Sequence, residues 1–284
     1  MSTSLRAKMI LFLKGMAMGV ADSVPGVSGG TIAVISGIYE PLINALKRCN
    51  PMALTVLWQK GPTEFWRSIH GPFLLTLGMG ILLSLLLMAN TVLYLLDNHR
   101  VQVMTFFMGL VLASCWLLRR EAGQWNVRTI VLFLLGFLLT AATAVLNPAA
   151  GSESLIYVFF SGMIAICAMI LPGISGAFIL ILLGVYEPVL DALRSFDFAV
   201  VVVFAAGCAI GLLSFSHLLS WTFHYYRQQT YAILTGMLAA SLIVLWPGTD
   251  EVLGSTVAGQ LAAICLFLAG GALILLFARL TRQS

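Results

Sequence analysis

A short run of proline, glycine and serine occurs twice in this chain, each time inside a long apolar segment. Residues 25–30 read PGVSGG and residues 172–177 read PGISGA. Gly-Ile-Tyr-Glu-Pro follows the first copy and Gly-Val-Tyr-Glu-Pro follows the second. Proline interrupts a helix and glycine adopts backbone angles closed to other residues, so each copy predicts a helix end followed by a turn.

The serine of each copy predicts the start of a new helix. Serine is a preferred N-cap, and the free N–H groups of a first helical turn, at the positive end of the helix dipole, bind anions without a cationic side chain. Gly29, Gly30 and Gly176 leave room for a ligand oxygen beside the backbone. Residues 28–36 would form about 13 Å of helix, roughly half a bilayer, so we interpret this segment as a half-helix.

Three acids lie in or beside the apolar segments, where a charge near the bilayer centre costs about 2.5–3.5 kcal/mol and indicates function. Asp22 precedes the first proline by three residues, and its counterpart in the second copy is Met169. Asp22 is therefore a candidate for coupling to H⁺ or Na⁺, or a carboxylate that caps the loop. Glu40 and Glu187, each followed by proline, are further coupling candidates, or lie at the headgroup level.

Three cations are candidate ligands for an anion. Lys14, eight residues before Asp22, either extends to the cytoplasmic surface or binds a phosphate. Arg100 and Arg227 occupy equivalent loop ends, where they would capture an anion at either leaflet or serve as ordinary loop charges.

The composition requires a membrane environment for these motifs. Hydrophobic residues make up 60% of the 284-residue chain and charged residues 9%, against about 25% in soluble domains. Six apolar stretches approach the roughly 20 residues that cross a bilayer, and we expect no removable signal peptide. They are residues 73–96, 101–118, 130–146, 198–221, 230–246 and 258–277.

The positions of the basic residues predict the orientation. If both motif segments enter and leave on one side and the N-terminus is cytoplasmic, only Arg100 and Arg194 of the 15 Lys and Arg residues lie outside. Because Lys and Arg concentrate in cytoplasmic loops, this predicts a multi-pass protein of the cytoplasmic (inner) membrane with both termini inside.

The chain also repeats as a whole. Between residues 15–46 and 162–193, at an offset of 147, 14 of 32 positions are identical. The crossings that follow match at an offset of 127, as Gly109 matches Gly236. We predict an all-α polytopic protein with inverted repeats at 1–150 and 151–284. Each repeat is a broken or re-entrant helix pair followed by three transmembrane helices, a plan typical of transporters that bind substrate between the repeats. With the two copies entering from opposite sides, we expect the two helix N-termini to face each other near the midplane and to bind one phosphate between them.

Enzyme chemistry finds little support in the sequence. The four histidines show no metal-ligand spacing, no nucleophile has a partnered base, and the five cysteines are scattered. We therefore expect a protein that is not an enzyme and holds no metal or cofactor, and nothing indicates a nucleic acid partner. Close helix packing is the other interpretation of the glycine and serine clusters.

Residues 14–31, KGMAMGVADSVPGVSGGT, followed by GIYE at 37–40, closely resemble the bacterial polyprenyl-phosphate transporter family. The resemblance implies movement of undecaprenyl phosphate, the lipid carrier of cell-wall sugars, from the outer to the inner leaflet for reuse. The implied partners are this lipid and the surrounding membrane lipid, and a second copy of the chain is a candidate partner. The alternatives are a transporter or channel for a small anion and a non-transporting scaffold for envelope enzymes. The candidate substrate-binding residues are Lys14, Ser28, Gly29, Gly30, Thr31, Ser175, Gly176, Arg100 and Arg227.

Overall fold

The computed structural model describes residues 5–23, 28–152, 154–254 and 256–282, and within these ranges the chain forms helices and their connections. The helices are α1 (Leu5–Asp22), α2 (Gly29–Ile35), α3 (Tyr39–Arg48), α4 (Pro51–Ser68), α5 (Gly71–Glu121), α6 (Val127–Val145), α7 (Leu155–Ile170), α8 (Gly176–Leu182), α9 (Tyr186–Arg194), α10 (Phe198–Tyr225), α11 (Arg227–Leu245), α12 (Thr249–Leu253) and α13 (Val257–Arg282).

Among the described residues, six segments are long and apolar enough to cross a membrane, as the sequence predicts. They are Gly71–Met88, Tyr94–Glu121, Val127–Val145, Phe198–Tyr225, Arg227–Leu245 and Val257–Leu276. The first two belong to α5, whose backbone leaves helical geometry at His99 (φ −139°, ψ 38°). The prediction of an all-helical membrane protein is therefore confirmed.

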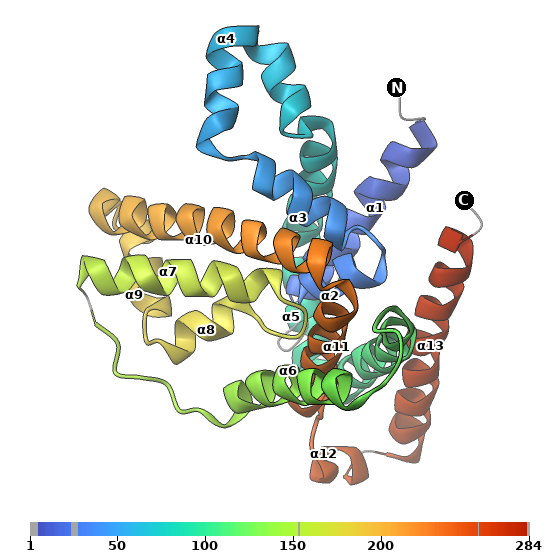
Figure 1. The fold of residues 1–284 in the computed structure, drawn as a ribbon. Helices are drawn as coiled ribbons and strands as arrows, with labels where there is room; N and C mark the ends of the chain where they lie inside the picture. The colour runs from blue at the N-terminus through green and yellow to red at the C-terminus, as the bar shows by residue number, and fades with distance from the viewer. Residues whose placement is uncertain (1–4, 24–27, 153, 255, 283–284) are drawn as a thin grey trace.

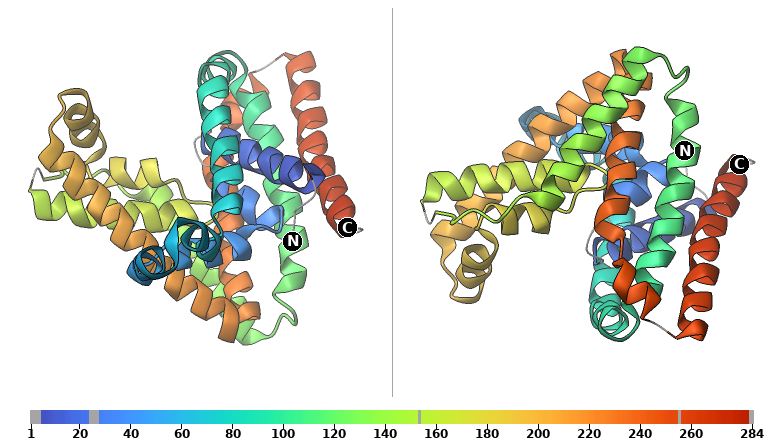
Figure 2. Two further views of the ribbon diagram at one scale, coloured as in Figure 1. Left: turned by 90° about the horizontal axis from the view of Figure 1, so that it is seen from above. Right: turned by 90° about the horizontal axis from the view of Figure 1, so that it is seen from below.

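The helices form two groups that meet at an angle. Figure 1 shows α7 and α10 side by side, whereas α5, α6, α11 and α13 make up the second group, which α1 crosses. Figure 2 shows the two groups diverging in both further views. The described ends of α1 and α13 lie near each other in all three views (Figures 1 and 2). The short motif helix α2 contacts both groups, through α1 and α5 on one side and α7 on the other.

Two helix pairs repeat the same close contact. In the pair α1 and α5, a Cβ at Gly15 would collide with the carbonyl oxygen of Leu77, and one at Gly80 with that of Phe12. In the pair α7 and α10, Gly162 approaches the carbonyl oxygen of Phe204 and Gly207 that of Phe159. The offsets agree with the sequence repeat, since 162 − 15 and 159 − 12 are 147, and 204 − 77 and 207 − 80 are 127.

The last helix of each predicted half packs against the other half. Helix α6 packs on α11, and α13 packs on the second part of α5. A Cβ at Gly109 would meet the carbonyl oxygen of Phe267, and one at the matched Gly236 would meet that of Phe133. The two predicted halves thus exchange their final helices.

Residues 50–70, between the first repeat segment and the first apolar stretch, contain the helical segment α4. Asn50 Oδ1 accepts a hydrogen bond from Ala53 N at 3.2 Å, and Pro51 occupies the first turn, where its missing N–H has no cost. Gly61, at φ 83°, breaks α4 into two helical parts, which project from the rest of the protein in Figure 1. Local capping residues therefore order a segment that has no match in the second half.

Candidate functional site

The first motif copy builds a short capped helix. Ser28 is the N-cap of α2 and its Oγ accepts a hydrogen bond from Gly30 N at 3.1 Å. Asp22, at the end of α1, accepts one from Gly29 N at 2.6 Å. Helix α2 has seven residues, about 10 Å, and ends at the C-cap Ser36, so the predicted half-helix is confirmed.

The second copy repeats this arrangement with fewer polar contacts. Helix α7 ends at Ile170, and Gly173 has φ 87°, a backbone angle that favours glycine. Ser175 is the N-cap of α8, its Oγ accepting from Phe178 N at 3.5 Å. The predicted helix end and turn are confirmed here, whereas residues 25–27 lie outside the described part of the chain. Helices α8 and α9 meet at a bend of 105°.

The two copies touch each other directly. Ser28 Oγ lies 3.3 Å from the carbonyl oxygens of both Met169 and Leu171, to which it is a donor. Gly173 N donates a hydrogen bond to Thr31 Oγ1 at 3.2 Å. A Cβ at Gly30 would collide with the carbonyl oxygen of Ile170. We call this contact the motif joint, made of residues 28–31 and 169–173. The close contact between the two motif copies therefore leaves no room for a side chain at position 30.

Groups of the protein already accept hydrogen bonds from the first three amides of α2. Asp22 accepts from the Gly29 N–H, Ser28 Oγ from the Gly30 N–H, and the Ser28 carbonyl from the Thr31 N–H. Asp22 has Met169 as its sequence counterpart, so the second copy has no matching carboxylate. An anion that approaches Gly29 N would therefore have to take the place of the Asp22 carboxylate.

Lys14 lies away from the joint. Its Nζ donates a hydrogen bond to the Ser36 carbonyl oxygen at 2.7 Å, at the C-terminal end of α2. Ser28 lies at the opposite end of this helix. A cation near the last carbonyls of a helix is stabilised by the helix dipole. The structure thus separates Lys14 from the serine and glycines with which the sequence groups it.

Glu40 of α3 and Arg227 of α11 form a second cluster, separate from the motif joint. Glu40 Oε1 accepts a hydrogen bond from the Tyr231 hydroxyl at 2.8 Å and pairs with Arg227 Nη2 at 3.0 Å. Sequence reasoning missed Tyr231, although it follows Arg227 by four residues and so lies on the same helix face. We call Glu40, Arg227 and Tyr231 the Glu40 latch.

Arg100 and Glu187 occupy positions apart from both clusters. Arg100 Nη1 lies 3.3 Å from Glu251 Oε1 of α12, and both side chains are largely exposed. Glu187 is exposed at the start of α9. The structure therefore brings together Asp22, Ser28, Gly29, Gly30 and Thr31, but leaves Arg100 and Glu187 elsewhere.

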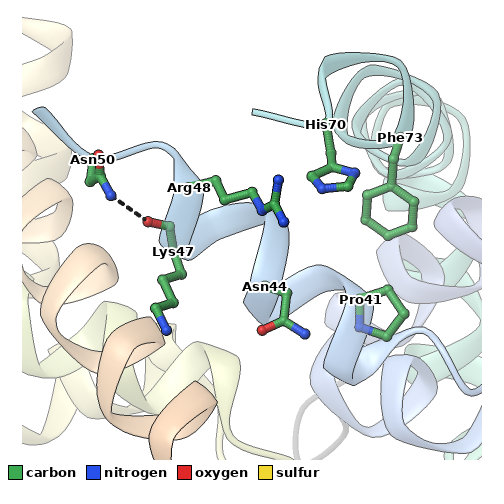
Figure 3. Close-up of a pocket in the computed structure, with 7 residues that line it drawn as sticks. All are labelled: Pro41, Asn44, Lys47, Arg48, Asn50, His70 and Phe73. Atoms are coloured by element: carbon green, nitrogen blue, oxygen red, sulfur yellow. Dashed lines mark hydrogen bonds between the residues drawn. The ribbon is translucent and has the colours of Figure 1, made fainter. Parts of the chain in front are cut away.

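Two pockets open on either side of α3. One has a volume of about 690 Å³ and borders the Glu40 latch. The other, of about 590 Å³, lies between α3 and the start of α5; Figure 3 shows the Arg48 and His70 side chains pointing toward each other there. Asn44 and Lys47 line both pockets. The lining is rich in cations and amides, which suit an anionic group.

A comparison with protein families identifies the chain. The model of the VCA0040-like family, described as undecaprenyl phosphate translocase-like, matches residues 18–260. This protein belongs to that family. The match includes both motif copies and most of the spans, so the family resemblance extends well beyond the motif.

Two relatives of this translocase-like protein carry the same name. A polyprenyl-phosphate transporter of Vibrio cholerae is 45% identical over 236 residues, covering 83% of this chain and 77% of the relative. A polyprenyl-phosphate transporter of Staphylococcus aureus is 30% identical over 306 residues, covering 98% of each. No solved structure matches the chain.

The translocase-like chain offers no metal centre in the part that the structure describes. Within it, no three His, Cys, Asp or Glu side chains gather where they could hold an ion. The five cysteines are unpaired, and Cys265 alone among them is exposed.

Proposed function

We propose that this protein moves polyprenyl phosphate across the bacterial cytoplasmic membrane, from the outer to the inner leaflet, so that the lipid carrier is used again. The observation that carries the proposal is the motif joint, where two broken helices meet inside a six-span helical protein. Membership of the family and the names of the two relatives support the substrate.

The joint would receive the phosphate headgroup through the amides of α2. A phosphate oxygen would replace the Asp22 carboxylate at Gly29 N, with Ser28 and Thr31 beside it. Release of Asp22 offers a step at which H⁺ or Na⁺ could be coupled to transport. The polyprenyl tail would stay in the bilayer, where apolar helix faces are exposed to it.

The halves of the chain would rock as inverted repeats around the joint, with both termini in the cytoplasm. The matched glycine contacts of α1 with α5 and of α7 with α10 support the repeat. Alternating access between such repeats is the usual mechanism of transporters with broken helices. In this arrangement the pockets beside α3 lie on the cytoplasmic side, where the phosphate would leave.

A leaflet-resolved transport assay tests the proposal. The purified protein is reconstituted into liposomes that contain undecaprenyl phosphate, and the lipid in the outer leaflet is measured with an impermeant phosphatase over time. We expect the protein to increase the fraction of lipid that becomes accessible, compared with empty liposomes. Equal accessibility with and without protein would reject lipid transport, and phosphate or chloride flux in its place would indicate a transporter of small anions.

A further inference from the structure

Helix α3 is fastened to the neighbouring helices by a continuous polar and aromatic seam. At its first turn, Glu40 accepts from Tyr231 and pairs with Arg227, and the Glu40 side chain is only 31% exposed. Beside it, the Tyr39 ring packs edge-on against Phe223, with ring centroids 5.8 Å apart. A carboxylate that is partly buried and bonded by two donors is held more firmly than an exposed ion pair.

The seam continues along α3 for two further turns. Lys47 Nζ donates to Ser220 Oγ at 3.2 Å, and Ser220 Oγ donates to Asn44 Oδ1 at 3.0 Å. Both partners of the seam, α10 and α11, come from the second predicted half, whereas α3 comes from the first. The seam therefore closes the protein between its halves at this face.

The repeat assigns a charged equivalent to the two charged members of the Glu40 latch, whereas Tyr231 corresponds to Met104. An offset of 147 takes Glu40 to Glu187, and an offset of 127 takes Arg227 back to Arg100. These offsets describe the structure as well as the sequence, because they relate the glycine contacts of α1 with α5 to those of α7 with α10. A symmetric molecule would therefore pair Arg100 with Glu187.

The structure does not pair these two residues. Helix α9, which carries Glu187, packs on α8 and α10, and Glu187 makes no ion pair with any residue that the structure describes. Arg100 instead pairs with Glu251 at 3.3 Å, and the two side chains are 59% and 45% exposed. Of the two equivalent connections, the one at Arg227 is formed and the one at Arg100 is not.

We propose that Arg100 and Glu187 form a second latch in another conformation of this protein, and that this latch closes when the Glu40 latch opens. The exposed Arg100–Glu251 pair holds Arg100 weakly, since solvent-exposed ion pairs contribute little to stability, so Arg100 is available for exchange. The described conformation is then closed at the Arg227 face and open at the Arg100 face. The proposal rests on the transport mechanism above, to which it adds the residues that hold each state.

Cysteine cross-linking measures the two latches separately. One variant carries Glu40→Cys with Arg227→Cys, the other Glu187→Cys with Arg100→Cys, both with the five native cysteines replaced by alanine or serine. Each is treated with a short bifunctional thiol reagent in liposomes, with and without undecaprenyl phosphate. We expect both variants to cross-link, and the lipid to shift the ratio of the two yields at least threefold in opposite directions.

A control and a second variant keep the test decisive. Glu64→Cys with Arg67→Cys, an exposed pair three residues apart within α4, should cross-link equally under all conditions.

Where the cysteine variants fail to fold, the charge exchange Arg100→Glu with Glu187→Arg should restore transport that Arg100→Glu alone removes. Failure of the Arg100–Glu187 variants to cross-link or to restore transport would overturn the second latch. Because cross-linking is read without transport, exchange of the latches in a protein that moves no polyprenyl phosphate would reject the proposed function alone.

Discussion

At the residue scale, Asp22 combines a negative charge with a structural role. Its carboxylate caps the first amide of α2 at 2.6 Å, a position that an anionic ligand would also take. The amide oxygen of asparagine can accept the same hydrogen bond from Gly29 N, so Asp22→Asn keeps this contact and removes the charge. We expect this variant to fold normally and to lose the dependence of its transport rate on pH and Na⁺ gradients, measured in liposomes.

Ser23→Ala is the matched control, because among the described residues the Ser23 hydroxyl donates only to the Gly19 carbonyl of the preceding helix α1. This neighbouring change should leave the gradient response intact. An Asp22→Asn protein that responds to the gradients as the unsubstituted protein does would exclude Asp22 from coupling and leave it only the capping role.

Thr31 is the one side chain of the first copy that accepts a hydrogen bond from the second copy's backbone in the described structure. Valine has nearly the same shape, so Thr31→Val leaves the packing intact but orphans the buried Gly173 N–H. An unsatisfied buried donor costs about 1–3 kcal/mol, and we expect that loss in the free energy of unfolding, measured by denaturant titration in micelles. Thr105→Val, whose hydroxyl bonds only within its own helix, should cost less. Equal losses would mean that the Thr31 bond adds nothing across the joint.

At the element scale, glycines set how closely the exchanged helices approach. Cβ atoms at Gly109 and Gly236 would each collide with a carbonyl oxygen of the crossing helix, α13 or α6. We expect Gly109→Ala and Gly236→Ala to lower the free energy of unfolding by similar amounts, about 1–3 kcal/mol each, because backbone carbonyls move less readily than side chains. Thermal unfolding in detergent compares them with Gly78→Ala, which has nothing within 4 Å and should gain about 0.5–1 kcal/mol. Unequal losses at the two positions would count against an equivalent packing of the halves.

The sequence predicts which segments form helices better than it predicts which helices pack against each other. The serine caps and the six spans follow from residue types within one stretch of chain, and the offsets follow from the internal similarity of the sequence. The structure has Ser28 and Ser175 as N-caps and α2 as a short helix, as expected. The contacts of Lys14 with Ser36 and of Glu40 with Tyr231 depend on which helices pack together, a fact that no local pattern contains.

At the scale of the whole molecule, the described contacts agree with the predicted placement of the two halves relative to each other. Arg100 is assigned to the outside, and its partner Glu251 follows the crossing at residues 230–246, which begins beside the inside residue Arg227 and so ends outside. Arg227 and Lys47, both assigned to the inside, lie at a single pocket beside α3. Long-range polar contacts therefore connect segments of the same predicted side, which a wrong orientation of one half would not produce.

The predicted sidedness is open to a direct test with two single cysteines. Ser152, between α6 and α7, should lie outside, and Gln124, between α5 and α6, should lie inside; both are exposed. In intact cells an impermeant maleimide should label Ser152→Cys, and it should label Gln124→Cys only after the membrane is permeabilised. The native cysteines are the background control, since Cys265, the exposed one, lies within the membrane-spanning part of α13. Labelling of Gln124→Cys in intact cells with protection of Ser152→Cys would reverse the orientation, and the phosphate would then leave α3 on the outer side.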